Sequence, residues 1–232
     1  PHLLEGEFMS ARPFQRGAAL LAATVLLAGC GTRTGGVAQD IEHEARKAYV
    51  PSEENKDPSR RIEGVVITEY RPMHAGEDQR VAYDEFPPYG GAHAPSWADC
   101  AGTVYPVPVR NENMIHSLEH GAVWIAYDPE RVRGGALDEL EAKVDGQPYL
   151  MLSPYPGLDR PVSVQSWGHQ LKLSQPDDPR IDLFIVALRD NPYTTPEPSA
   201  PCSANPAQFD VSDPPPFDPS PPGPDAYPVQ GP

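Results

Sequence analysis

Hydrophobic and polar positions are patterned most clearly in the middle of the chain. The stretch 114–120 has helical spacing and contains His116 and His120, Gly121 follows it, and the apolar run 122–127 comes directly after. Glycine often ends a helix because it adopts a left-handed backbone without steric cost. A short apolar run is typical of a buried strand. The pattern therefore predicts a short helix, a glycine cap and a buried strand at the centre of the fold.

Segments on both sides of this centre complete a single α+β domain. Apolar residues at helical spacing predict helices over 137–144 and 180–190. Extended patterns predict strands or extended segments at 65–70, 81–83, 105–109, 149–152 and 162–164. We expect one compact domain over residues 62–206, in which about three helices cover a small mixed or antiparallel sheet.

The flanking regions lack this periodicity. Residues 1–8 precede Met9 and are interpreted as upstream, non-native sequence, whereas 9–29 has a basic start and a short apolar run, as in a secretory signal. Residues 30–61 are polar and predict a tether. Residues 207–232 are rich in proline and acidic groups, which predicts a disordered tail.

The apolar run of the signal closes with Leu27-Ala28-Gly29-Cys30, which resembles the lipobox of bacterial lipoproteins. In such proteins the cysteine becomes the lipidated first residue of the mature chain. We therefore expect a lipid on Cys30 that anchors the protein at the extracytoplasmic face of the bacterial cell membrane. The alternative is an ordinary signal peptide with an incidental cysteine.

Charge narrows the range of partners. The chain has 18 Lys and Arg against 33 Asp and Glu, a net charge of -15. Such a chain repels phosphate backbones, so no nucleic-acid partner is expected, and it is repelled by anionic lipid surfaces as well. No apolar run reaches the roughly 18 to 20 residues of a spanning helix. A lipid anchor would supply the membrane attachment that this composition otherwise disfavours.

Three cysteines are present in the sequence. If Cys30 carries a lipid, Cys100 and Cys202 remain as an even pair in an oxidising compartment, which predicts a disulfide between them. Two free thiols, or one cysteine acting as a metal ligand, are the alternatives.

Several of these motifs together resemble one bacterial family, the domain of unknown function numbered 3105. The most specific part is His-Ser-Leu-Glu-His-Gly-Ala-Val at 116–123. The other shared positions are Gly91-Ala92-His93, Trp97, Cys100, Gly102, Tyr105, Trp124, Ser153-Pro154, Trp167-Gly168 and Pro196-Glu197 before Cys202. One departure is Ala101, which separates Cys100 from Gly102. The resemblance covers roughly 62–202 and implies an envelope-associated protein, and it implies no particular activity.

The histidines are the main candidates for chemistry. Two histidines four residues apart share one helix face and can chelate one metal ion, with His93 on a stiff loop as a third ligand. His74 and Glu119 are further candidate ligands, and imidazoles in an oxidising envelope suit copper or zinc. The competing hypothesis is that His116 and His120 are buried and bind neighbouring groups only through hydrogen bonds.

An enzymatic function has less support in the sequence. The pattern His116-x-x-Glu119-His120 matches the inverted zinc-peptidase motif, in which the glutamate is the general base. No Gly-x-Ser-x-Gly nucleophile motif, phosphate loop or dinucleotide fingerprint occurs. We interpret the protein as a non-enzymatic binding or accessory protein of the cell envelope with a histidine-based copper or zinc site. A metal-free structural module that docks onto an envelope or membrane protein, and a zinc-dependent hydrolase, are the two alternatives.

Overall fold

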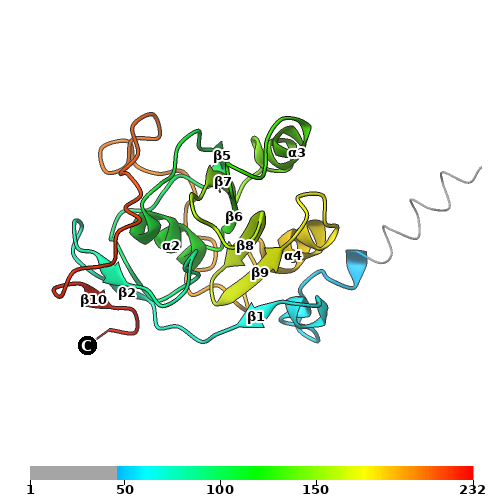
Figure 1. Cartoon of the computed structure of the whole chain (residues 1–232). Coiled ribbons are helices and arrows are strands. Elements are labelled where there is room, and N and C mark those ends of the chain that lie inside the picture. Colours follow the sequence, from blue (N-terminus) through cyan, green and yellow to red (C-terminus); the bar gives the residue numbers. More distant parts are fainter. Residues whose placement is uncertain (1–45, 232) are drawn as a thin grey trace, which may run out of the picture.

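The computed structural model describes residues 46–231, which form one compact α+β domain around a mixed six-stranded sheet (Figure 1). The strand order is β1-β9-β8-β6-β7-β5. Neighbours β6, β7 and β5 run parallel, whereas β6-β8, β8-β9 and β9-β1 are antiparallel. The strands are β1 (Val66–Ile67), β5 (Ala101–Val104), β6 (Val123–Tyr127), β7 (Leu150–Pro154), β8 (Val162–Ser166) and β9 (His169–Leu173).

Short pairs and helices surround this sheet. Strand β2 (Met73–His74) pairs parallel with β4 (Ala92–His93), and β3 (Val81–Ala82) pairs parallel with β10 (Tyr227–Pro228). The helices are η1 (Pro58–Arg61), α2 (Asn111–Glu119), α3 (Gly135–Val144) and α4 (Arg180–Leu188). Figure 1 shows α2 on one side of the sheet and α3 and α4 on the other.

The two faces of the sheet are packed by different residues. Alternate positions of β6 point to opposite sides, so that Val123 and Ile125 contact the core beneath α3 and α4, while Trp124 and Ala126 contact the core around α2. The first face is apolar and mostly aliphatic, with Tyr127 and Phe184 as its buried aromatic residues. The second holds buried polar groups as well, and the indole of Trp124 donates a hydrogen bond to Ser153 Oγ (2.9 Å).

Helix α2 lies in the interior, and all nine of its residues are buried. Its carboxyl end is closed by a Schellman motif, because the Gly121 N–H donates to Leu118 O and the Ala122 N–H donates to Ser117 O, both at 3.0 Å. Gly121 has φ of 98°, a value that glycine adopts readily. The predicted sequence of helix, glycine cap and buried strand is therefore confirmed, and it fixes the direction in which α2 meets β6.

The predictions for the other elements had mixed outcomes. Helices α3 and α4 confirm the predicted 137–144 and 180–190 within a few residues, and α4 buries its apolar stripe. Of the extended segment expected at 105–109, only Val109 makes a β-bridge, to Pro216, and the regular edge strand β5 lies just before it at 101–104. Strand β9 was not predicted, although Leu171 and Leu173 alternate with the polar Gln170 and Lys172 at the period of a strand.

The carboxyl-terminal segment differs from the disordered tail that we expected over 207–232. The structure places 207–231 against the domain: Phe209 is buried, Phe217 packs at a tilt against Tyr155 with ring centroids 4.8 Å apart, and Tyr227 pairs with Val81. Prolines already restrict the unfolded chain, so a few aromatic anchors order a segment of low average hydrophobicity at reduced entropic cost.

Several expectations lie outside the described residues. Residues 1–8, the signal 9–29, Cys30 and the first part of the tether belong to this group. Within 46–231, no helix is long and apolar enough to cross a membrane.

Candidate metal centre

Three imidazoles and one carboxylate converge at one end of α2. His74, His93, His116 and Glu119 each offer one ligand atom, and these atoms all lie within 4.8 Å of one another. The three imidazole rings are mutual neighbours, with centroids 4.9 to 5.0 Å apart. Among residues 46–231, this is the one group of His, Cys, Asp and Glu side chains close enough to hold a metal ion together.

Two of these histidines are brought together by the short β2-β4 pair. In this parallel ladder His74 is the direct partner of His93, so both side chains project from the same side. The Ala75 N–H donates to His93 O (2.7 Å), which extends the pairing beyond the histidines. His93 is fully buried, whereas the side chain of His74 is 52 % exposed. The ladder therefore supplies one internal and one solvent-facing imidazole.

Helix α2 supplies the other two groups. His116 and Glu119 are three residues apart, lie on one helix face and are each 4 % exposed. All three imidazole Nε2 atoms approach the same atom, Glu119 Oε2. The distances to it are 2.9 Å from His93, 3.8 Å from His116 and 3.9 Å from His74. Glu119 thus forms the centre of the cluster.

The two buried rings are oriented by backbone carbonyls. His93 Nδ1 donates to Gly91 O and His116 Nδ1 donates to Ala94 O, both at 2.8 Å. Since a carbonyl only accepts, each Nδ1 carries a proton, and Nε2 is the ring nitrogen that faces the cluster. This arrangement, with one ring nitrogen anchored on a carbonyl and the other facing the cluster, is typical of metal-binding histidines.

Electrostatics at the site favour the deprotonated ligands. Burial, reinforced by the neighbouring imidazole of His93, lowers the pKa of His116 to about 3. Burial alone would raise the pKa of Glu119, but the hydrogen bond from His93 and the surrounding imidazoles hold it below its ordinary value. At neutral pH a carboxylate and a neutral His116 imidazole therefore face the same point, as metal binding requires.

The contact between His93 Nε2 and Glu119 Oε2 brings two electron-rich atoms together. Because His93 Nδ1 already donates to a carbonyl, the 2.9 Å contact to a carboxylate needs a proton or a cation between the two atoms. A proton there makes an imidazolium–carboxylate pair. A metal ion bound at this point would displace that proton.

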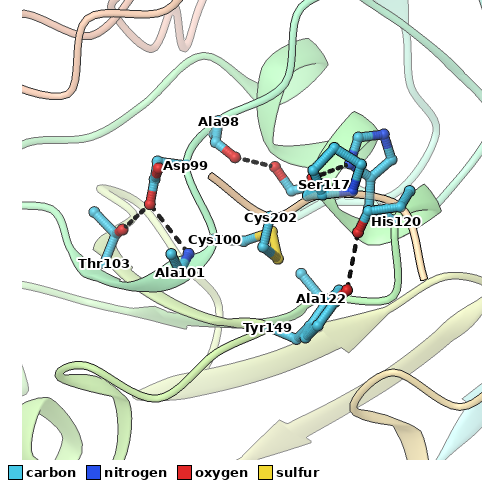
Figure 2. Close-up of a disulfide and its surroundings, with 12 residues drawn as sticks. Ala98, Asp99, Cys100, Ala101, Thr103, Ser117, His120, Ala122, Tyr149 and Cys202 are labelled. Carbon is cyan, nitrogen blue, oxygen red and sulfur yellow. Dashed lines mark hydrogen bonds between the residues drawn. A yellow bond between two sulfur atoms is a disulfide. The ribbon is translucent and has the colours of Figure 1, made fainter. Parts of the chain in front are cut away.

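Aromatic rings and a disulfide enclose the cluster. Trp167 meets His93 edge-on (5.8 Å between centroids), and Trp97 contacts the rings of His116 (5.5 Å) and His120 (4.8 Å). The predicted Cys100–Cys202 disulfide is present and ties the Trp97 loop to the chain near Pro201. Beside it the Ser117 hydroxyl donates to Ala98 O (2.6 Å), which holds this loop against α2 (Figure 2). The loop therefore has both covalent and hydrogen-bonded attachments to the helix.

His120 lies beside the cluster, outside the set of converging atoms. Its ring is 4.7 Å from that of His116, but its Nδ1 donates to Pro201 O (2.8 Å) and its Nε2 faces Glu197 Oε2 at 3.6 Å. Burial lowers the pKa of His120. The structure thus groups His74 and Glu119 with two of the three histidines that we favoured as ligands.

This arrangement differs from the inverted zinc-peptidase pattern. That pattern needs the two helix histidines on the metal and the glutamate free as a base. Here the glutamate is the central group and only His116 of the helix pair belongs to the cluster. Two methionines lie near these groups: Met114 is fully buried in the core, whereas Met73 borders the site.

The cluster opens into a shallow hollow of about 250 Å³. Its walls are Pro72, Met73, His74, Glu119 and Glu197. Glu197 appeared in the sequence only as part of the family pattern, and its position at this opening was missed. Glu197 lies 78 positions after Glu119 in the sequence, and proximity between residues so far apart leaves no periodic signal.

One family model matches the chain. Residues 74–204 match the model described as Protein of unknown function (DUF3105). The chain belongs to this family. The matched region begins at His74 and includes the whole histidine cluster and both disulfide cysteines. No curated protein and no solved structure matches the chain.

Proposed function

We propose that this DUF3105 domain is a non-enzymatic metal-binding module of the bacterial cell envelope. It holds a copper or zinc ion at His74, His93, His116 and Glu119. Through a lipid on Cys30 it is attached to the extracytoplasmic face of the membrane, where it serves an accessory role for an envelope or membrane protein.

The observation that carries the proposal is the convergence of three Nε2 atoms on one carboxylate oxygen. Their distances from Glu119 Oε2 range from 2.9 to 3.9 Å. A tetrahedral zinc with bonds of about 2.0 to 2.1 Å keeps its ligands roughly 3.3 Å apart, close to the distances from Glu119 Oε2. The ligand atoms that now lie up to 4.8 Å apart would have to draw closer together. Imidazole nitrogens suit both Zn²⁺ and Cu²⁺, and Cu²⁺ generally binds the more tightly of the two.

The proposal is tested by metal content. The full chain, purified in detergent without a polyhistidine tag, is exposed to Zn²⁺ or Cu²⁺, passed through a desalting column and analysed for bound metal. We expect tightly held metal in the parent protein. His116→Ala should weaken the affinity for the metal ion by more than about 100-fold. Even changes to groups that only support a ligand lower metal affinity roughly 10- to 100-fold.

The control is His169→Ala, which removes a buried histidine from a different part of the sheet. His169 Nδ1 donates to Trp167 O (2.6 Å), and its ring is not a member of the cluster. A folded parent protein without tightly held metal would overturn the proposal, as would equal loss of metal in the two variants.

One observation favours the metal-free alternative, a structural docking module. The Nδ1 atoms of His93, His116 and His120 each hold a loop carbonyl, and such bonds stabilise loops without any metal. Under this alternative His116→Ala lowers stability in metal-free buffer, and added Zn²⁺ does not raise the melting temperature of the parent. Under the proposal, Zn²⁺ stabilises the parent by mass action and leaves the variant unchanged.

Attachment to the membrane is tested separately. Cys30→Ala should move the protein from the membrane fraction to the soluble fraction, because the acidic chain has no other membrane affinity that its composition predicts. Cys202→Ser serves as the control, since it removes a different cysteine and leaves Cys30 in place. Retention of Cys30→Ala in membranes would contradict the lipid anchor.

A further inference from the structure

The pair His120 and Glu197 stands directly beside the histidine cluster and outside it. His120 is 3 % exposed, and its Nδ1 is committed to Pro201 O at 2.8 Å. The neutral ring therefore directs a lone pair from Nε2 toward Glu197 Oε2, 3.6 Å away. Within 46–231, no hydrogen bond reaches this nitrogen. A lone pair that faces a carboxylate at this distance is repelled by it unless a cation or a proton lies between the two atoms.

Glu197 is fixed at this place by its backbone. Its N–H donates to Glu119 O (3.1 Å), the last residue of α2, and the disulfide at Cys202 closes the following turn. Its side chain is 54 % exposed and lines the hollow together with His74 and Glu119. Glu197 thus brings a second carboxylate to the opening of the cluster.

Glu119 has one carboxylate oxygen still available. The three imidazole contacts all go to Oε2, and no described residue donates a hydrogen bond to Oε1. A carboxylate whose two oxygens are free to act separately can contact two neighbouring cations, as in two-metal sites. The ring of His120 lies 4.7 Å from that of His116, so a second position beside the first is sterically close.

We propose that His120 and Glu197 form a second, weaker position for Zn²⁺ or Cu²⁺ at the opening of the histidine cluster, an inference that rests on the proposed metal-binding function. Two protein ligands leave the remaining coordination to water, so an ion at this position exchanges readily. Because Glu197 lines the hollow and His120 lies behind it, an ion held by the pair would sit beside the route between the solvent and the deeper site.

The test is a Zn²⁺ titration of the tag-free full chain, read by native mass spectrometry and by competition with a chromophoric chelator. We expect two bound ions in the parent protein, one tight and one weak. Both His120→Ala and Glu197→Gln should lose the weak ion and keep the tight one. Glu139→Gln, an exposed carboxylate on α3, is the matched control and should keep both.

The outcomes separate this inference from the proposed function. Saturation at one ion in the parent overturns the second position and leaves the first intact, whereas no ion at all overturns both. A second ion that survives in both His120→Ala and Glu197→Gln also overturns the inference. Glu197→Gln keeps the test decisive if His120→Ala unfolds, because the Glu197 side chain is half exposed and its replacement is nearly isosteric.

Discussion

The two faces of the six-stranded sheet are built from different kinds of interaction. Beneath α3 and α4, aliphatic side chains from four strands fill the core, and regular helices cover them. On the opposite face, α2 and a set of irregular loops enclose imidazoles, carboxylates, amides and hydroxyls whose positions depend on hydrogen bonds. One face is stabilised by apolar area that is insensitive to orientation, and the other depends on individual directed bonds.

This difference separates stability from chemistry within one small domain. Apolar burial contributes roughly 25 cal/mol per Å² without demanding any particular partner. A buried histidine or glutamate destabilises the fold unless each polar atom is satisfied. The aliphatic face therefore supports a polar face on which three imidazoles and a carboxylate converge.

The largest expected effect comes from the aliphatic face. Phe184 on α4 is fully buried, so Phe184→Ala should lower the free energy of unfolding by about 3 to 5 kcal/mol, as large-to-small changes in cores do. Chemical denaturation measures this change. In the fraction that remains folded, the affinity for Zn²⁺ should equal that of the parent, because none of the four clustered side chains lies on this face.

Leu183→Ala on the same helix is the control, since Leu183 only borders that core and its truncation should cost clearly less. A marked loss of Zn²⁺ affinity in folded Phe184→Ala would show that the two faces are not independent.

The same division explains which features the sequence could predict. Helices α3 and α4 follow from apolar periodicity, because one face of each helix packs on a uniform core. The β2-β4 ladder has only two residues in each strand, too few for any periodic signal, yet it places His74 against His93. Spacing alone favoured His116 with His120, whereas His116 with Glu119 is the helix pair within the cluster.

The order of the carboxyl-terminal segment could not be predicted from its composition either. Its composition is that of a disordered chain, and composition averages over the few residues that matter. Arg80 forms an ion pair with Asp218 and donates to Ser220 O (3.0 Å), and the Arg110 N–H donates to Pro215 O (2.9 Å). These contacts join positions more than 100 residues apart, so no local pattern reveals them.

A smaller effect, but one on the polar face, is expected from the disulfide. The bridge joins residues separated by 102 positions, and replacing both Cys100 and Cys202 with serine should cost about 2 to 4 kcal/mol. Unlike Phe184→Ala, this change should also weaken Zn²⁺ binding, since it frees the loops that carry Trp97 and Pro201 against the histidines. Thermal unfolding and Zn²⁺ titration of the same samples measure the two effects.

Reduction of the parent protein with a phosphine provides the matched comparison, because it opens the bridge without a substitution. Unchanged Zn²⁺ affinity in both the reduced parent and the double variant would show that the disulfide stabilises the fold without shaping the site.

The smallest expected effect is a pH dependence of the free energy of unfolding, to which the polar face contributes through His116. The pKa of His116 is about 3 in the folded protein and 6.5 when unperturbed, so between these values the unfolded chain takes up a proton that the folded protein does not. The contribution of His116 to the free energy of unfolding is then fully present above about pH 6.5. It falls as pH drops below this value, by up to about 1.4 kcal/mol per pH unit for one proton. Urea unfolding with EDTA present, at about pH 7 and about pH 5, measures this slope.

His116→Gln should reduce this pH dependence, leaving the contribution of His120, whereas Phe184→Ala should lower stability equally at both pH values. An unaltered slope in His116→Gln would mean that the acid sensitivity of the fold originates outside the cluster.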